Sequence, residues 1–200
     1  MLTVGDKLPE FTVPVQQGTS ALPAGETLSH DSFPGKWKVI FYWPKDFTFV
    51  CPSELIALDH RIPDFQARNV EVIGVSIDSH FTHNAWRNTP INAGGIGQVK
   101  YTLAADITHE ICKAYDVEAA GGVAYRGAFL IDLNGVVRAQ IVNDLPLGRS
   151  MDELLRLVDA LQFTEEHGEV CPANWKKGDK GMTASPEGVA AYLSENASSL

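Results

Sequence analysis

The chain has 200 residues, of which 44% are hydrophobic, and its formal net charge is −9 at pH 7. This composition suits one packed domain with an additional arm and excludes a disordered chain. The acidic balance argues against sequence-independent binding of nucleic acid, which needs a basic face, and it disfavours attachment to anionic membranes. We therefore expect neither nucleic acid nor a membrane among the partners.

The cysteine content and the N-terminal residues indicate a compartment. Three cysteines are too few for a disulfide scaffold in a chain of this length. No apolar run reaches the roughly 18 residues that a membrane span needs. Residues Met1–Asp6 lack the basic and apolar regions of a secretion signal. We expect a cytoplasmic, reducing setting, in which a cysteine with a role is catalytic or redox-active.

The first third of the chain predicts turns, a strand and a helix. Residues 1–37 fit only short extended pieces such as Phe11–Val13, because they hold many turn formers. These turn formers are Pro9, Pro14, Gly18, Pro23, Gly25, Pro34 and Gly35. Residues 39–43 predict the first strand, and apolar residues at steps of three and four predict a helix over 53–67. Pro63 should kink or divide that helix.

The remaining elements follow in alternation. The continuous apolar run 70–77 is typical of a strand buried on both faces of a sheet. The predicted elements after it are a helix over 80–88, a loop over 92–97, a strand over 102–105, a helix over 108–115, and strands over 127–132 and 136–142. Asn134-Gly135 predicts a hairpin between the last two strands.

The C-terminal part predicts two helices joined by a polar link. Ser150 and Glu153 form a capping box that opens a helix with an apolar stripe from Leu154 to Leu161. Residues 165–169 are expected to be a polar link, and Ser185 is expected to cap a last helix that ends near residue 195. The order of elements indicates an α/β fold with a mixed central sheet flanked by helices. This pattern is compatible with a thioredoxin-like sheet and with other small α/β folds.

Cys51 is the first candidate functional residue. Pro44 ends the strand before it, and Pro52 favours the first turn of a helix, which places Cys51 at or beside the helix N-cap. The positive end of the helix dipole and the free backbone N–H groups stabilise a thiolate there. The alternative is a small buried hydrophobic residue, which is a common fate of a free cysteine.

Two neighbours of Cys51 suggest a binding pocket. Thr48 lies three residues earlier, so one tight turn would aim its hydroxyl at the sulfur, where it could hold a substrate oxygen. Pro44 would wall the pocket and restrict water. Each of these residues taken alone is also compatible with an ordinary loop.

A carboxylate on the same helix can anchor arginines. Glu54 is a candidate anchor, with Arg126 and Arg149 as its candidate partners. A guanidinium near Cys51 would favour the thiolate. Arg126 alone would more often be a surface or salt-bridged residue.

Several other residues carry no predicted role. Cys112 is expected to be a packed, inert thiol. Asp78, His80 and His83 lack a convincing set of metal ligands, and solvated or capping histidines are expected. Gly94–Gly97 has the wrong spacing and context for a dinucleotide loop. We therefore expect no metal and no cofactor.

The segment Asp46–Glu54 closely resembles the active-site segment of the typical two-cysteine peroxiredoxins, the alkyl hydroperoxide reductase C group. Ser53 stands where that family usually has threonine, and Trp43 is less usual. Neither change removes a catalytic group. Three further segments resemble the family in the expected order: Tyr125–Asp132 with an active-site arginine, Gly148–Ser150 with a second arginine, and Gly168–Trp175 with the resolving cysteine.

The resemblance implies a thioredoxin-like fold and a thiol peroxidase without metal, haem or flavin. Cys51 would attack the terminal peroxide oxygen and become a sulfenic acid. Thr48, Arg126 and the Cys51 backbone N–H would hold the peroxide oxygens. Cys171 of the partner subunit would then form a disulfide with Cys51. On the same basis, Pro44 belongs to the site, and Glu54 and Arg149 support it.

The resemblance also implies domains and partners. Residues 1–163 would form the peroxidase domain, and residues 164–200 would form an arm carrying the resolving cysteine. The substrates would be hydrogen peroxide and alkyl hydroperoxides, and the reductant a dithiol: an AhpF-like flavoprotein, a thioredoxin or an AhpD-like adaptor. The chain would form homodimers that assemble into rings of dimers, such as decamers.

Two other functions remain open. A disulfide oxidoreductase of the thioredoxin type is disfavoured, because Cys51-Pro52 is followed by Ser53 and Glu54 and not by a second cysteine. The resemblance to the peroxiredoxins leaves a further function open: rings of dimers in that family can bind unfolded clients, so an oligomeric holdase or peroxide-sensing role could coexist with peroxidase activity.

Overall fold

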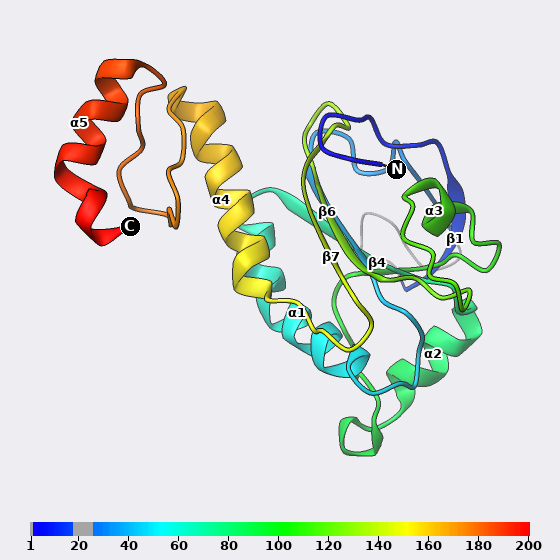
Figure 1. The fold of residues 1–200 in the computed structure, drawn as a ribbon. Coiled ribbons are helices and arrows are strands. Elements are labelled where there is room, and N and C mark those ends of the chain that lie inside the picture. Colours follow the sequence, from blue (N-terminus) through cyan, green and yellow to red (C-terminus); the bar gives the residue numbers. More distant parts are fainter. Residues whose placement is uncertain (1, 18–25) are drawn as a thin grey trace. The chain divides into compact units, whose positions relative to one another are not determined.

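The computed structural model describes residues 2–17 and 26–200 and divides into two compact units, Met1–Met151 and Asp152–Leu200 (Figure 1). Three of the expected turn formers, Gly18, Pro23 and Gly25, lie outside the described residues. The predicted domain boundary after residue 163 stays a prediction.

Among the described residues, seven strands form one mixed sheet in the first unit. They are β1 (Thr12–Gln17), β2 (Thr27–Ser29), β3 (Trp37–Tyr42), β4 (Val70–Ser76), β5 (Thr102–Ala105), β6 (Arg126–Ile131) and β7 (Val137–Asn143). Their order is β2-β1-β5-β4-β3-β6-β7. The three central strands β5, β4 and β3 run parallel, and the outer strands pair antiparallel. The predicted mixed sheet is therefore confirmed.

The helices occur where the sequence places them. The first unit holds α1 (Cys51–Gln66), α2 (His80–Asn88), the 3-10 turn η1 (Ile91–Ala93) and α3 (Glu110–Ala114). The helix α4 (Met151–His167) begins at the last residue of the first unit, and α5 (Pro186–Asn196) and the 3-10 turn η2 (Ala197–Ser199) follow in the second. Over residues 2–17 and 26–200, no helix has both the length and the apolar character needed to cross a bilayer.

The two faces of the sheet bury different side chains. Ile40 and Tyr42 of β3 pack on one face with Phe129 of β6 and Tyr115, which follows α3. Alternation along a strand therefore sends Phe41 to the opposite face. That face carries α1, whose Leu55 carbonyl accepts a hydrogen bond from the Tyr101 hydroxyl at 3.1 Å. Residue 126 of β6 is three positions from Phe129, so its side chain also points to the α1 face.

Pro63 lies inside α1 without dividing it, so of the two expected effects, a kink or a division, the division does not occur. The proline has no N–H to donate to the carbonyl of Asp59. The helix continues because its next turn still forms, with Ala67 N–H donating to the Pro63 carbonyl at 3.0 Å. The apolar face also holds across this point, since Ile62 and Phe65 are both buried.

In the second unit, the polar residues expected to form a link extend α4 instead. Glu165 and Glu166 are helical, the helix ends at His167, and Gly168 follows with a φ of 69°. The prediction of a link beginning at residue 165 is therefore wrong, because polar residues are compatible with an exposed last turn. The predicted cap of α5 is confirmed, since Ser185 accepts a hydrogen bond from the backbone of Gly188 at 3.0 Å.

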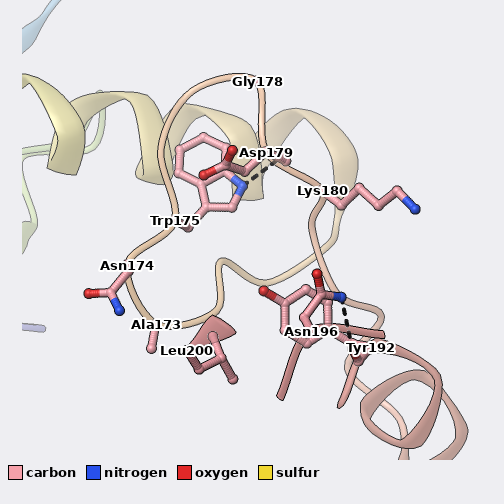
Figure 2. Close-up of a pocket in the computed structure, with 9 residues that line it drawn as sticks. All are labelled: Ala173, Asn174, Trp175, Gly178, Asp179, Lys180, Tyr192, Asn196 and Leu200. Atoms are coloured by element: carbon pink, nitrogen blue, oxygen red, sulfur yellow. Dashed lines mark hydrogen bonds between the residues drawn. The ribbon is translucent and has the colours of Figure 1, made fainter. Parts of the chain in front are cut away.

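The second unit also contains a cavity of about 470 Å³ (Figure 2). Its lining residues are Ala173, Asn174, Trp175, Gly178, Asp179, Lys180, Tyr192, Asn196 and Leu200. The loop on one side is held by the Trp175 indole, which donates to the Asp179 carbonyl at 3.1 Å. Trp175 is buried and also packs on Phe163 of α4, with ring centroids 4.9 Å apart.

We expect Gly74→Ala to destabilise the first unit. A Cβ at this position in β4 would lie 2.9 Å from the Trp43 ring, 3.1 Å from Tyr101 and 3.2 Å from Leu103. Overpacking of this kind costs about 1–3 kcal/mol. Urea unfolding should show the loss, whereas Gly121→Ala, whose Cβ would meet no atom within 4 Å, should change stability by less than about 0.5 kcal/mol. Equal stability of the two variants would contradict the packing described here.

Candidate active site

Cys51 is the first residue of α1, directly after the loop that follows β3. The strand ends at Tyr42, and Pro44 is buried in the loop. Val50 is the N-cap residue and makes no side-chain capping bond, and Pro52 occupies the first turn. The start of α1 therefore offers its dipole to the Cys51 sulfur without competition from a capping side chain.

Two polar groups converge on the Cys51 sulfur. The Thr48 hydroxyl lies 2.9 Å from Sγ, and Nη1 of Arg126 lies 3.5 Å from it. Cys51 itself has no exposed surface (0%), whereas Thr48 is half-buried and reaches solvent. The sulfur therefore lies buried next to two hydrogen-bond donors, of which the Thr48 hydroxyl belongs to a partly exposed residue.

The Thr48 hydroxyl has two acceptors within reach but only one proton. It lies 2.7 Å from the Lys45 carbonyl and 2.9 Å from Sγ of Cys51. A thiol can itself donate to the Thr48 oxygen, which leaves the hydroxyl proton for Lys45. A thiolate has no proton to donate and can only accept one from Thr48.

Glu54, one turn along α1, joins the two arginines. Its Oε2 accepts hydrogen bonds from Arg126 Nη1 at 2.8 Å and from Arg149 Nη2 at 3.0 Å. Its Oε1 accepts from Nε of Arg149 at 2.9 Å and from the Arg149 backbone at 2.7 Å. One carboxylate therefore fixes both guanidinium groups, and the same Nη1 of Arg126 that binds Glu54 faces the sulfur.

Backbone carbonyls also accept hydrogen bonds from the two arginines and help to hold them in place. Arg126 is the first residue of β6, and its Nε donates to the Leu145 carbonyl at 2.6 Å. Arg149 donates to the Gly127 carbonyl, and its guanidinium carbon lies 3.4 Å from the centroid of the Phe41 ring. The guanidinium groups are thus held by several elements and do not depend on Glu54 alone.

The charges of this cluster favour an anion at the sulfur. Burial by itself raises the pKa of Glu54, but the hydrogen bonds and charge of Arg149 and the charge of Arg126 outweigh it and hold that pKa below its ordinary value. Burial lowers the pKa of Arg149, against the opposing effect of Glu54. Two guanidinium groups and one carboxylate together carry a net charge of about +1. A Cys51 thiolate would neutralise that charge.

A second buried cluster, centred on Asp46, fixes the loop between β3 and α1 through contacts with α2 and with the segment after β4. The sequence did not predict this cluster. His83 Nδ1 lies 2.7 Å from Asp46 Oδ2, and both side chains are fully buried. Trp43 Nε1 donates to Asp46 Oδ1 at 2.8 Å, and the Asp46 backbone donates to Asp78 at 2.8 Å. The expectation of a solvated or capping His83 is therefore wrong. One sequence signal was available for a buried His83. The residue lies three positions after the start of the helix at 80–88, on the side that packs against a buried strand.

The other two cysteines are Cys171, in the second unit, and Cys112, in the first. Cys171 is half-buried in the second unit, where its Sγ lies 3.5 Å from the Ala160 carbonyl and 3.7 Å from the Thr164 hydroxyl. Cys112 in α3 is buried on the sheet face opposite α1. Burial, followed by the charge of Asp106, raises the pKa of Cys112 to about 12.

Comparisons with known proteins identify the family of the chain. Residues 4–140 match the AhpC/TSA family, and residues 160–195 match the C-terminal domain of 1-Cys peroxiredoxin. The chain is 56% identical to alkyl hydroperoxide reductase C of Helicobacter pylori over 94% of both chains. It is 46% identical to peroxiredoxin-2 of Rattus norvegicus over 96% of both.

A solved structure of a related protein has the same fold. The reduced 2-Cys peroxiredoxin of Plasmodium vivax superposes with a TM-score of 0.90 at 46% identity, covering 96% of this chain and 98% of that one. The predicted thioredoxin-like fold is therefore confirmed. The chain belongs to the AhpC/TSA family, and its enzyme class is that of the peroxiredoxins, which are thiol-dependent peroxidases.

We expect Glu54→Gln to destabilise the protein and to change its response to acid. Removing one partner of a buried ion pair leaves uncompensated charge and costs about 3–5 kcal/mol. Because the folded-state pKa of Glu54 is depressed, its contribution is complete above the ordinary carboxyl pKa and is lost as the pH falls through the folded value. Urea unfolding of Glu54→Gln should therefore show a smaller loss of stability on acidification than the wild type.

Asp64→Asn is the matched control for this substitution. Asp64 lies on the same helix but pairs with Arg61 on the surface, where both side chains are more than 40% exposed. Such pairs contribute at most about 1 kcal/mol. If Asp64→Asn and Glu54→Gln had equal effects, the cluster around Glu54 would not have the energetic weight assigned to it.

Proposed function

We propose that Cys51 is the peroxidatic cysteine of this peroxiredoxin and that Thr48 and Arg126 bind the peroxide beside it. The observation that carries this proposal is the convergence of a hydroxyl at 2.9 Å and a guanidinium at 3.5 Å on one sulfur. Pro44, buried in the same loop, shields the site from water, and Glu54 and Arg149 hold Arg126 in place.

In the first step, the Cys51 thiolate attacks the terminal oxygen of the peroxide. A new S–O bond forms while the O–O bond breaks, so the sulfur is oxidised to sulfenic acid and the peroxide is reduced to an alcohol or water. Arg126 and Thr48 stabilise the charge that develops on the leaving oxygen. That oxygen takes up a proton from solvent or from the site.

In the second step, Cys171 of the partner subunit condenses with the Cys51 sulfenic acid, releasing water and forming a disulfide. A disulfide requires Cα atoms within about 7 Å, and Cys51 is fully enclosed at the start of α1. The first turn of α1 must therefore open after oxidation. The bonds to be broken include those that Ser53 and Glu54 N–H groups make to the Val50 carbonyl, at 3.1 and 3.3 Å.

We infer the partners from the relatives. One relative is named alkyl hydroperoxide reductase C, and another, from Drosophila melanogaster, is named a thioredoxin-dependent peroxide reductase. These names support hydrogen peroxide and alkyl hydroperoxides as substrates and a dithiol as reductant, from a thioredoxin, an AhpF-like flavoprotein or an AhpD-like adaptor. We also propose that the protein is cytoplasmic and forms homodimers that assemble into rings of dimers.

Substitution at two positions tests the first step. Cys51→Ser should abolish peroxide consumption. Thr48→Val keeps the shape but loses the hydroxyl, and removal of one such donor typically lowers the rate about 100-fold or more. Thr48→Ser, the matched control, should stay within about tenfold of the wild type in a stopped-flow assay of peroxide reduction. Activity that survives in Cys51→Ser would refute the proposed function.

A non-reducing gel of peroxide-treated protein tests the second step. The wild type should give a disulfide-linked dimer, because each Cys51 pairs with the partner's Cys171. Cys171→Ser should lose that band while still consuming one equivalent of peroxide. Cys112→Ser is the control and should keep the dimer. A dimer band that persists in Cys171→Ser would assign the resolving role to another thiol.

A further inference from the structure

A cluster of three metal-ligating side chains lies outside the active site. A ring nitrogen of His109, the sulfur of Cys112 and a carboxylate oxygen of Glu118 lie within 4.8 Å of one another. His109 precedes α3, Cys112 lies on α3, and Glu118 follows it. Cys112 packs on the sheet face opposite the one that carries α1, so this cluster takes no part in the chemistry proposed for Cys51.

We propose that His109, Cys112 and Glu118 form a binding site for one zinc ion. Imidazole, thiolate and carboxylate are the ligands that Zn²⁺ accepts, and three protein ligands with an open fourth position are a common zinc arrangement. Bond lengths of about 2.0–2.3 Å place ligand atoms about 3.3–3.6 Å apart in a tetrahedron. To bind the ion, the His109–Glu118 pair at 2.5 Å would open by about 1 Å, and separations of up to 4.8 Å would close by a similar amount.

The backbone holds the three residues in position. His109 has a left-handed conformation, with a φ of 59°, and its N–H donates to the Asp106 carbonyl at 2.9 Å. The Asp106 carboxylate accepts the Cys112 N–H at 2.7 Å, which orients the first turn of α3. Glu118 begins a short antiparallel bridge with Ala124. Each ligand thus comes from backbone that is already hydrogen-bonded.

The charges and the access also suit a dication. A neutral imidazole, a thiolate and a carboxylate carry two negative charges, which Zn²⁺ neutralises in a largely buried place. Cys112 is buried, but the side chains of His109 and Glu118 are 25% and 27% exposed, so an ion can enter between them. When the ion binds, the Cys112 proton leaves to solvent.

The alternative to a zinc site is a simple ion pair between His109 and Glu118, which explains fewer of the contacts in the cluster. His109 Nδ1 lies 2.5 Å from Glu118 Oε1, which a pairing of the two side chains would explain. Ion pairs between partly exposed side chains, here 25% and 27% exposed, contribute little to stability. Core packing accounts for the burial of Cys112, but the pairing of His109 with Glu118 does not involve its sulfur, which lies within 4.8 Å of both ligand atoms. A zinc ion explains all three residues together.

Cobalt is the spectroscopic probe for this site. In full-length protein carrying Cys51→Ser and Cys171→Ser, Cys112 is the last of the three cysteines. Titration with Co²⁺ should then give a sulfur-to-cobalt charge-transfer band that saturates at one ion per chain and disappears when Zn²⁺ is added. Absence of this band would overturn the proposal. Calorimetry of wild-type protein with Zn²⁺ should give a site of the same stoichiometry.

Variants of the half-exposed ligands keep the test independent of folding. Loss of an outer-shell partner typically weakens metal binding 10–100-fold, so His109→Ala and Glu118→Gln, which remove ligands, should each weaken Zn²⁺ binding at least about 100-fold. Glu110→Gln, on the same helix and exposed, is the matched control and should leave binding unchanged. Binding that is insensitive to both ligand variants, or equally sensitive to Glu110→Gln, would overturn the assignment.

Discussion

The active site depends on one buried carboxylate placed between two guanidinium groups. Glu54 binds Arg126 and Arg149 at 2.7–3.0 Å and leaves the trio with a net positive charge beside the Cys51 sulfur. Buried charges of this kind are costly unless they are paired and hydrogen-bonded. Here Nε of Arg126 also donates to the Leu145 carbonyl, and Nη1 of Arg149 donates to the Gly127 carbonyl. These bonds hold the two guanidinium groups in place, and Nη1 of Arg126 faces the sulfur at 3.5 Å.

Two regular elements, α1 and β6, and two irregular segments bring these groups together. In α1, Cys51 and Glu54 are three residues apart and so lie on one side of the helix. In β6, alternation points Arg126 to the α1 face of the sheet and Phe129 to the opposite core. Arg149 comes from the segment just before α4 and stacks on Phe41 of β3. Regular secondary structure therefore positions Cys51, Glu54 and Arg126, whereas irregular segments supply Arg149 and Thr48.

The local part of this arrangement could be predicted from the sequence, and the long-range part could not. The proline after Cys51 and the threonine before it indicate a helix start with a hydroxyl nearby. The contacts of Glu54 join residues 72 and 95 positions away, so residue patterns alone gave only candidate partners, and the family resemblance gave their roles. His83 was misread because burial of a polar residue depends on what packs over it, here Asp46.

The errors in the elements have similar physical causes. Along the start of β1, Phe11 just before the strand and Val13 and Val15 within it are buried in alternation with exposed residues, but Pro14 obscures this strand pattern in the sequence. Pro63 suggested a break in α1, yet the tertiary burial of Ile62 and Phe65 maintains the helix across the lost hydrogen bond. In both cases packing outweighs the local preference of a proline, and packing is not visible in a window of sequence.

The single hydroxyl proton of Thr48 links the ionisation of the sulfur to the freedom of the loop. When Cys51 is a thiol, that proton can tie Thr48 to the carbonyl of Lys45, three residues earlier. When the sulfur is charged, the proton turns to it and the tie to Lys45 is given up. The thiolate form thus lacks a hydrogen bond between Thr48 and Lys45 that the thiol form can keep. One hydrogen atom serves either the backbone of the loop or the charged sulfur, and not both.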